Sequence, residues 1–350
     1  MYTVKRRTVG SNRRDLEQDE MRTIPPISII IPAYKAEKHI QKVLASIPPL
    51  VSLIFVVDDC SPDRTGELVR ACTDQRVSLV THEKNQGVGG AVITGYAKAA
   101  EAGAQIIIKM DSDNQMDPDF LIPLIAPILK QEADYTKGNR FLHTENLRSM
   151  PFVRRVGNAG LSFLTKAASG YWNVFDPTNG YTAIHASILP LLNKSRLHRR
   201  YFFESSLLIE LGMIRAVVQD VAIPAVYKDE DSALSEWKAL LEFPWRLMAG
   251  FLRRLITQYF VRDFGIFSIM LVLGLIFSLF GLLFGLYHWY LSSITGVVAS
   301  TGTVMIAVLP LILGAQLLIQ SLIVDMQNVP STPLCVKIDF INNIYQKFLR

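Results

Sequence analysis

The chain has 350 residues, enough for about two domains, and a net charge of +5. Half of the residues are apolar and only 19% are charged, and the apolar excess lies almost wholly after Phe264, which indicates membrane spans rather than a larger globular core. The basic residues form no long stripe, which argues against nucleic acid as a partner, and the three cysteines lack metal-ligand spacing, so we interpret them as free thiols in a reducing compartment.

The amino-terminal segment, residues 1–24, is polar and basic. It lacks the apolar stretch that a secretory signal peptide needs. We therefore expect a disordered basic tail that stays on the cytosolic side of a membrane.

Residues 25–235 contain a regular alternation of strand and helix patterns, which we expect to form the catalytic domain. Short apolar runs alternate four times with segments of helical spacing. This rhythm is typical of an α/β fold in which a parallel sheet is covered by helices on both faces. We expect strands at 27–32, 53–59, 77–81 and 105–109, and helices at 37–47, from an N-cap at Ser61, at 89–102 and at 153–169.

The fourth strand pattern runs directly into Asp111-Ser112-Asp113. Ligands bind at the carboxyl edge of such sheets, and alternate residues of a strand face the same side, so we expect Asp111 and Asp113 to face one small volume. Two close carboxylates repel each other unless a cation lies between them, and Mg²⁺ favours one or two carboxylates plus substrate phosphates. A solvated turn after a strand has the same Asp-x-Asp pattern, so the surrounding motifs must decide.

A glycine-rich segment, Asn85–Ala91, lies between the third strand pattern and its helix. Glycines permit close backbone approach, and a helix amino terminus offers backbone amides to an anion. Helix packing explains such a segment as well, and the segment is not a Walker loop because no Gly-Lys-Ser/Thr follows. Together with the acid-tipped strands, it favours a nucleotide-diphosphate site.

Four segments carry a resemblance to a known family. They are Ile31-Pro32-Ala33-Tyr34 followed by Glu37, then Val56–Thr65, Asn85–Ala91 and Asp111–Pro118. In this order they resemble family 2 glycosyltransferases, and within these the group of dolichyl-phosphate mannosyltransferases and bacterial polyprenyl-phosphate glycosyltransferases. The resemblance covers about residues 25–240. It implies the A-type glycosyltransferase fold, with a Rossmann-like, mostly parallel sheet, and a nucleotide-sugar donor held through Mg²⁺ or Mn²⁺.

The resemblance also implies which residues hold the donor. It implies a nucleotide-sugar site of Pro32, Tyr34, Glu37, Asp59, Gln86, Gly87, Asp111, Ser112 and Arg140, and a metal site of Asp111, Asp113 and Gln115. In this set Arg140 reaches the diphosphate, which suits a planar guanidinium. From the residues alone, an exposed salt bridge explains Arg140 equally well, and Gln115 fits a polar helix start.

The acceptor side is expected at Asp176, Asn179 and Glu204, because the family has a comparable acidic and Asn-Gly segment there. Asp113, Asp176 and Arg140 are the candidate catalytic residues. A phosphate acceptor is already ionised near neutral pH, so an aspartate would orient it rather than deprotonate it. From the residues alone, Asp176-Pro177 is an ordinary turn with Gly180 as its left-handed exit, and Glu204 is an acid in the first turn of a helix.

The chain departs from the family after the last sheet strand. Many relatives carry an arginine-rich segment there that binds the acceptor phosphate, whereas this chain has only Lys228 as a basic residue. Either Lys228 binds the acceptor phosphate, helped by Arg196, Arg199 or Arg200, or the acceptor is held differently.

The carboxyl-terminal third has the pattern of a membrane anchor. Residues 236–263 mix tryptophan and arginine, which predicts an interfacial amphipathic helix, although a core helix has a similar pattern. Residues 264–324 contain two uncharged spans, each longer than the roughly 20 residues that cross a bilayer, and 325–350 would be a cytosolic tail. Arginines before the first span and lysines after the second predict that the catalytic domain and both termini face the cytosol, at the bacterial inner membrane.

These patterns predict an inverting, metal-dependent transfer of one sugar from a nucleotide sugar, UDP- or GDP-linked, to a polyprenyl phosphate such as undecaprenyl or dolichyl phosphate. The alternatives are a transferase for a polysaccharide or glycolipid acceptor, and a membrane scaffold with a vestigial nucleotide-sugar site. The small residues Gly274, Gly281 and Gly285 suggest packing of the spans against other copies, as a homo-oligomer.

Overall fold

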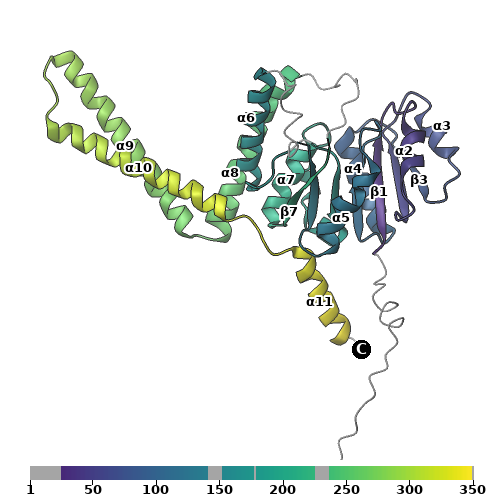
Figure 1. Ribbon diagram of the computed structural model, residues 1–350. Helices are drawn as coiled ribbons and strands as arrows, with labels where there is room; N and C mark the ends of the chain where they lie inside the picture. Colours follow the sequence, from purple (N-terminus) through teal and green to yellow (C-terminus); the bar gives the residue numbers. More distant parts are fainter. Residues whose placement is uncertain (1–24, 141–151, 177–178, 225–235, 349–350) are drawn as a thin grey trace, which may run out of the picture.

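The computed structural model describes residues 25–140, 152–176, 179–224 and 236–348 (Figure 1). Within these residues it contains one seven-stranded sheet with the strand order β3-β2-β1-β4-β6-β5-β7. The strands are β1 Ile27–Ala33, β2 Leu53–Asp58, β3 Val77–Thr81, β4 Ile106–Lys109, β5 Tyr135–Asn139, β6 Thr182–His185 and β7 Val218–Ala222. The predicted α/β fold and the four predicted strands are confirmed.

Strand β6 is the one strand of this sheet that runs against its neighbours. It pairs antiparallel with both β4 and β5, whereas the other pairs are parallel. Its register places Thr182 opposite Lys109 at the carboxyl end of β4. The residues just before β6 therefore reach the sheet edge at which β4 ends.

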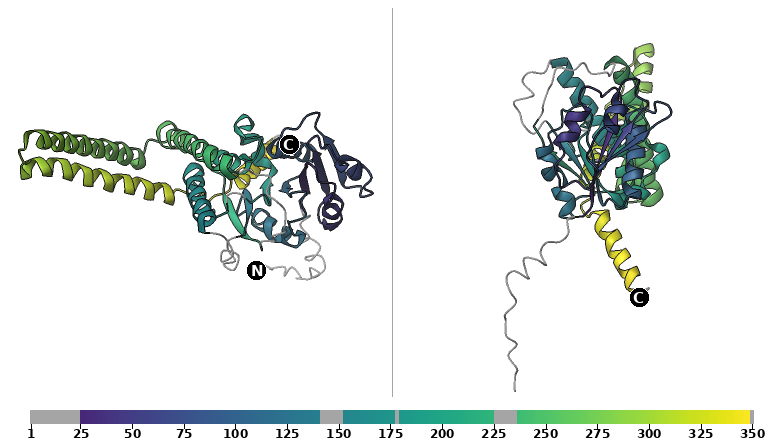
Figure 2. Two further views of the ribbon diagram at one scale, coloured as in Figure 1. Left: turned by 90° about the horizontal axis from the view of Figure 1, so that it is seen from above. Right: turned by 90° about the vertical axis from the view of Figure 1, so that its right-hand side faces the viewer.

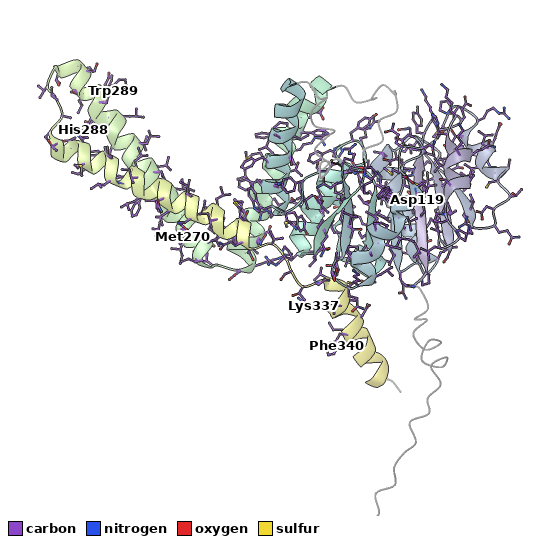
Figure 3. All side chains as sticks on the ribbon, viewed as in Figure 1. Asp119, Met270, His288, Trp289, Lys337 and Phe340 are labelled. Atoms are coloured by element: carbon purple, nitrogen blue, oxygen red, sulfur yellow. The ribbon has the colours of Figure 1, made fainter. Side chains whose placement is uncertain are left out.

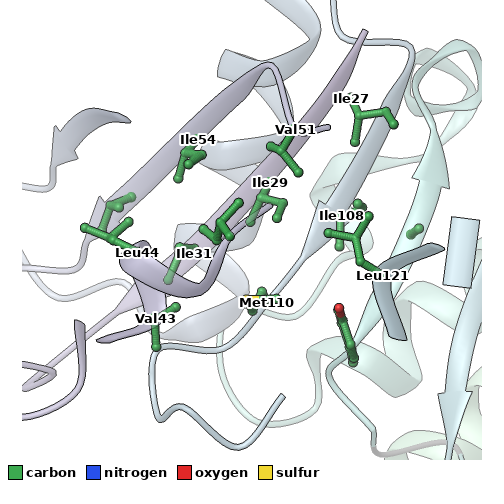
Figure 4. Close-up of a cluster of buried hydrophobic side chains, with 14 of the residues drawn as sticks. Ile27, Ile29, Ile31, Val43, Leu44, Val51, Ile54, Ile108, Met110 and Leu121 are labelled. Carbon is green, nitrogen blue, oxygen red and sulfur yellow. The ribbon is translucent and has the colours of Figure 1, made fainter. Parts of the chain in front are cut away.

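Helices cover both faces of the sheet. On one face, apolar side chains of α2 (Ile40–Ser46), α3 (Thr65–Arg70) and α5 (Leu121–Leu129) pack in one cluster with Ile27, Ile29 and Ile31 of β1, which Figure 4 shows. The opposite face is covered by α4 (Val88–Glu101) and α7 (Phe203–Ile214). The remaining short helices are η1 Pro118–Phe120, η3 Ala186–Leu191 and η4 Lys194–Arg196. Burial of these β-branched side chains on both faces is the main favourable term for the fold.

The start of α3 differs from the prediction. The helix begins at Thr65, so the N-cap predicted at Ser61 is wrong. The Ser61 amide donates to the Asp58 carboxylate at 3.0 Å, and the Ser61 hydroxyl accepts from the Lys35 amide at 3.2 Å. Ser61 thus joins the loop after β2 to the loop after β1, and a local helix-start pattern cannot reveal such a long-range bond.

Two long apolar helices extend away from the catalytic domain as a hairpin (Figures 1 and 2). They are α9 (Ile266–Thr295) and α10 (Thr301–Gln327), with mean hydropathies of 2.7 and 2.2 over their most apolar windows. Only 22% and 6% of those windows are buried, so the helices are not core helices of the domain. Both exceed the roughly 20 residues needed to cross a bilayer. Figure 3 labels Met270, His288 and Trp289 along α9.

The hairpin glycines contact the neighbouring helix of the same chain. A Cβ on Gly281 would lie 2.6 Å from the Ala307 carbonyl oxygen, and one on Gly274 would lie 3.0 Å from the Leu318 side chain. A Cβ on Gly285 would lie 3.4 Å from Ala307. These glycines therefore lie where α9 and α10 approach each other, and packing of the hairpin against other copies stays a prediction.

Helix α8 (Glu236–Ile256) precedes the hairpin and continues into a π-helical turn, Thr257–Arg262. It packs beside α6 (Phe152–Ser169) and also contacts α7. An outer row of apolar side chains is exposed on α8, namely Trp245, Met248, Leu252 and Ile256. The row is consistent with the interfacial helix, whose place at a membrane surface stays a prediction.

The arginines before the hairpin bind protein groups. Arg253 donates to Glu210 of α7, and Arg262 donates to the Met213 carbonyl. The sequence predicted an interfacial helix here from its mixture of tryptophan and arginine. These two contacts attach α8 and the π-helical turn after it to α7.

A buried ion pair connects the hairpin to the catalytic domain. Arg254 of α8 and Asp325 of α10 are 1% and 3% exposed, and their N–O distances are 2.7 and 2.8 Å. Asp325 also accepts from the Tyr259 hydroxyl at 2.6 Å and from the Trp172 indole at 3.0 Å, while Arg254 donates to the Ala167 carbonyl at 2.8 Å. Because every oxygen of Asp325 has a partner, the charge is tolerated inside the protein.

The carboxyl-terminal helix α11 (Leu334–Phe348) also contacts the catalytic domain. The buried Asp134 carboxylate accepts from the Leu334 and Cys335 amides at 2.8 Å each, and from the Val217 amide at 2.8 Å. Figure 3 shows Lys337 and Phe340 on this helix. The chain after the hairpin therefore returns to the domain.

Replacing Arg254 with Met should lower the free energy of unfolding by about 3 kcal/mol or more, because Asp325 would stay buried without its counter-charge. The matched control is Lys98→Met, which removes the exposed pair between Lys98 and Glu101. Lys98→Met should change the free energy of unfolding by no more than about 1 kcal/mol. Chemical unfolding of the full chain in detergent micelles measures both, and equal losses would contradict the role of the buried pair.

Candidate functional site

A pocket of about 490 Å³ opens at the carboxyl edge of the sheet. Its lining comes from the loops after β1, β2 and β4, namely Tyr34, Lys35, Ala36, Glu37, Lys38, His39, Pro62, Asp63, Ser112 and Asp113. The volume suits a small-molecule ligand. The structure thus brings together four of the predicted nucleotide-sugar or metal residues, Tyr34, Glu37, Ser112 and Asp113. Pro32 lies inside β1 and is buried.

Hydrogen bonds between two loops hold the rim of this pocket. The Thr65 hydroxyl accepts from the Ala36 amide at 2.8 Å, and Asp63 accepts from the Glu37 amide at 3.3 Å. In return, the Glu37 carboxylate accepts from the Arg64 amide at 3.2 Å. Burial acts to raise the pKa of Asp63, but hydrogen bonds from Thr65 and Glu37 outweigh it and the net shift is downward. Hydrogen bonds within the protein therefore hold the rim of the pocket.

The acidic segment forms a turn and not a continued strand. Strand β4 ends at Lys109, Asn114 has a φ of 58°, and the Gln115 amide donates to Asp113 at 3.0 Å. The prediction that Asp111 and Asp113 face the same side as alternate residues of a strand is therefore wrong. Asp113 lines the pocket, whereas Asp111 is paired with Lys109 at 2.8 Å.

Lys109 is a central residue that sequence reasoning missed. Its side chain is 2% exposed, and its ammonium nitrogen lies 2.8 Å from Asp111 and 3.1 Å from Glu204, at the start of α7. Burial acts to lower the pKa of Lys109, but the carboxylates of Asp111 and Glu204 outweigh it and the net shift is upward. The sequence feature that could have revealed Lys109 is a lysine within a strand of isoleucines, because a buried charge requires partners. Lys109 links the predicted metal side to the predicted acceptor side.

Gly180 lies directly against this ion pair. A Cβ at Gly180 would lie 2.4 Å from the Asp111 carboxylate and 2.5 Å from the Lys109 ammonium. The alternative interpretation of Gly180 as a left-handed turn exit does not hold, because Gly180 is not among the residues with positive φ. Close approach of the antiparallel strand β6 is the reason for this glycine.

Arg140 and Asp176 form a bidentate pair. The guanidinium donates to the two Asp176 oxygens at 2.8 and 3.2 Å, and the Arg140 amide donates at 3.3 Å. Asp176 is fully buried, while Arg140 is partly exposed. Two of the three candidate catalytic residues are thus in contact, and the diphosphate contact of Arg140 stays a prediction.

The loop before β6 is also held by a buried lysine of β5. Lys137 donates to the Asn179 carbonyl, and the Asn179 side chain accepts from the Tyr181 amide at 2.9 Å. In β7, Asp220 accepts from Asn139 and from the Phe175 amide, each at 2.7 Å. The predicted acceptor residue Lys228 lies outside the described residues.

Asp59 organises the glycine-rich segment. Its carboxylate accepts from the Gln86 amide at 2.8 Å and the Gly87 amide at 2.7 Å, and it lies 2.7 Å from the His82 ring. The Gly90 amide donates to the Arg199 carbonyl at 3.1 Å. These three amides are used within the protein, so any ligand contact of Gln86 or Gly87 would use other atoms, and the nucleotide role of this segment stays a prediction.

The oxygen ligands in the acidic segment fit a hard divalent cation that is also bound by oxygen atoms of a substrate. In the part of the chain that the structure describes, no group of three His, Cys, Asp or Glu residues could hold a metal alone. Asp111 and Asp113 supply two carboxylates within one turn, and Mg²⁺ commonly binds one or two carboxylates plus substrate phosphates. Gln115 follows in the same segment and has an amide oxygen to offer.

Gly180→Ala should destabilise the protein by about 1–3 kcal/mol, because the new methyl group would force Lys109 and Asp111 apart. The control is Gly160→Ala on α6, where a Cβ meets nothing within 4 Å. That change should be neutral or slightly stabilising, since alanine favours helix. Thermal unfolding of both variants in detergent is the measurement, and a neutral Gly180→Ala would contradict the close approach.

Lys137 should make stability depend on pH. Burial lowers the pKa of Lys137 to about 8 from 10.5, so between these values the unfolded chain binds more protons than the folded one. The free energy of unfolding of the wild type should therefore rise with pH through this window, relative to Lys137→Met. Denaturant unfolding at pH 7.5 and pH 10 compares the two proteins. If wild type and Lys137→Met differ in free energy of unfolding by the same amount at both pH values, the lowered pKa of Lys137 is contradicted.

Known proteins resemble this chain in sequence and in fold. Residues 28–191 match the family described as Glycosyl transferase family 2. A UDP-N-acetylglucosamine–dolichyl-phosphate N-acetylglucosaminyltransferase of Methanococcus voltae is 33% identical over 222 residues, which cover 59% of this chain and 88% of that protein. An undecaprenyl-phosphate mannosyltransferase of Micrococcus luteus is 27% identical over 205 residues, which cover 57% of this chain and 83% of that protein.

The fold likeness extends to a solved structure. Glucosyl-3-phosphoglycerate synthase from Mycobacterium tuberculosis, crystallised with Mn²⁺, uridine diphosphate and glucosyl-3-phosphoglycerate, superposes with a TM-score of 0.50 at 22% identity. The match covers 71% of this chain and 86% of that chain. At this identity the likeness concerns the fold.

Proposed function

Because this chain belongs to glycosyl transferase family 2, we propose that it transfers a single sugar from a nucleotide-diphosphate sugar to a polyprenyl phosphate. The observation that carries the proposal is the pocket at the sheet edge, where Tyr34 and Glu37 meet Ser112 and Asp113. The relatives named for dolichyl phosphate and undecaprenyl phosphate support a polyprenyl phosphate acceptor. The apolar hairpin supports a lipid acceptor, since it would keep the pocket beside a membrane.

The donor would lie across the pocket. Tyr34, which is 48% exposed, would flank the nucleobase together with Glu37, and the diphosphate would point toward Asp113. Asp111, Asp113 and Gln115 would hold Mg²⁺ or Mn²⁺, which when bound supplies positive charge to the leaving diphosphate. The Mn²⁺ and uridine diphosphate in the similarly folded synthase support this arrangement and a UDP-linked donor.

The transfer itself would be a single displacement. A phosphate oxygen of the acceptor attacks the anomeric carbon on the face opposite the diphosphate. The new carbon–oxygen bond forms as the bond to the diphosphate breaks, so the configuration inverts and the nucleoside diphosphate leaves with the electron pair. The acceptor phosphate is already ionised, so the step needs no strong general base.

The chain's own charged residues would orient both partners. Asp176 holds the Arg140 guanidinium through two oxygens, so Arg140 is positioned to neutralise charge on the leaving diphosphate. Asn179 and Glu204 lie on the neighbouring segments, where they would face the acceptor. Asp176 would act through Arg140 and is a positioning residue in this scheme.

The geometry supports a catalytic domain and carboxyl terminus on one side of the membrane. Helix α10 returns to the domain through Asp325, and α11 is attached through Asp134. We propose the cytosol as that side and the bacterial inner membrane as the location. We also propose that the chain divides into a domain at 25–235, a helical region at 236–263, a hairpin at 264–324 and a tail at 325–350. Because α10 continues to Gln327 and α11 packs on the domain, this tail would belong to the catalytic unit.

The proposal is tested with the purified full chain, a panel of UDP- and GDP-sugars, and undecaprenyl or dolichyl phosphate. Asp111→Asn and Asp113→Asn should each lower sugar transfer about 100-fold or more, as expected for lost electrostatic stabilisation of the leaving group. The control Asp119→Asn changes an exposed carboxylate nearby and should leave transfer unchanged (Figure 3). Chelation of divalent cations should stop transfer, and Mn²⁺ or Mg²⁺ should restore it.

Other outcomes would overturn specific parts of the proposal. Transfer to a polysaccharide or glycolipid but not to a polyprenyl phosphate would overturn the proposed acceptor. Neither transfer nor hydrolysis of any nucleotide sugar would favour a scaffold with a vestigial site. Undiminished turnover in both aspartate variants would overturn the proposed metal role of Asp111 and Asp113.

A further inference from the structure

Lys109 connects two parts of the site that the proposed function treats separately. Its ammonium group lies between Asp111, which follows β4, and Glu204, which begins α7. These carboxylates are 32% and 15% exposed, whereas the lysine is 2% exposed. A buried cation therefore occupies one side of the carboxylate to which the proposed function assigns a divalent metal.

This position makes Lys109 a competitor of a bound dication. A divalent cation on Asp111 would meet a second positive charge 2.8 Å from one oxygen of the same carboxylate. Repulsion between charges is strong where little water screens them. Metal binding at Asp111 should therefore be weaker with this lysine than without it.

The surroundings keep Lys109 in place. Gly180 covers the pair so closely that a Cβ would lie 2.5 Å from the ammonium nitrogen and 2.4 Å from Asp111. The lysine backbone is paired with Thr182 of β6. Glu204 gives the ammonium group a second carboxylate, so Lys109 can release Asp111 to a metal without becoming an unpaired buried charge.

We propose that Lys109 is a positioning residue that makes metal binding at Asp111 depend on the nucleoside diphosphate. The metal alone meets the ammonium charge and binds weakly. A nucleoside diphosphate brings negative charge to the same place, offsets the ammonium group and allows the metal to bind. Metal and nucleotide thus enter as a coupled pair, and this rests on the proposed metal role of Asp111.

The test measures Mn²⁺ affinity of the full-length protein in detergent by electron paramagnetic resonance, without nucleotide and with saturating UDP or GDP. Wild type should bind Mn²⁺ weakly alone and more tightly with one of the nucleotides. Lys109→Met should bind Mn²⁺ alone at least tenfold more tightly, and the gain from the nucleotide should shrink. Lys109→Arg keeps the charge and should resemble wild type.

A second variant guards against loss of folding in Lys109→Met. Glu204→Gln leaves the ammonium group with Asp111 alone and removes a nearby negative charge, so it should weaken binding of Mn²⁺ alone. Opposite shifts in two variants of one ion pair are not expected from general structural damage. Unfolding curves of each variant, measured in the same detergent, identify any that has lost its fold.

The outcomes separate this inference from the proposed function. If Asp111→Asn abolishes Mn²⁺ binding but Lys109→Met binds Mn²⁺ no more tightly than wild type, the coupling role of Lys109 is overturned and the metal site stands. If Lys109→Met does not fold, unchanged or tighter Mn²⁺ binding in Glu204→Gln overturns the coupling role. If Asp111→Asn binds Mn²⁺ as well as wild type, the metal position fails, and with it both this inference and that part of the proposed function.

Discussion

A buried charged side chain must have an opposite charge beside it, and this requirement organises the carboxyl edge of the sheet. Lys109 bridges Asp111 and Glu204, and Arg140 grips Asp176 through two oxygens. The Lys109–Glu204 and Arg140–Asp176 pairs join segments that are distant in the chain. Electrostatic contacts therefore join the end of β4 to the start of α7, and the end of β5 to the loop before β6.

A buried ion pair also attaches the apolar hairpin to the catalytic domain. Arg254 and Asp325 are both buried, and Trp172 and Tyr259 complete the hydrogen bonds of the aspartate. Because this pair joins α8, the end of α6 and the end of α10, it sets how the hairpin leaves the domain. A site that must meet a lipid phosphate needs such a fixed orientation, since a loose tether would place the pocket at no defined height above the membrane.

Local patterns and long-range contacts differ in what sequence can reveal. The strands and the spans have strong periodic or apolar signals, and their positions agree with the structure. The predicted N-cap at Ser61 fails because the serine bonds Asp58 and Lys35 instead of starting a helix. The close approaches at Gly180 and at the hairpin glycines were not predicted, because contact with another segment leaves no local sequence signal. The arginines before the hairpin likewise contact protein groups that lie far away in the chain.

The sequence by itself determined the alternating α/β domain, the two apolar helices and the family motifs, since short-range periodicity and hydropathy encode these features. Only the tertiary structure decided that Asp113 lines the pocket while Asp111 pairs with Lys109, that Asp59 holds the glycine-rich segment, and that Arg254 holds Asp325. The physical reason is that a buried charge selects its partner by distance in space. The antiparallel insertion of β6 brings Gly180 against Lys109, and the return of α10 brings Asp325 to Arg254; no local run of residues predicts either contact.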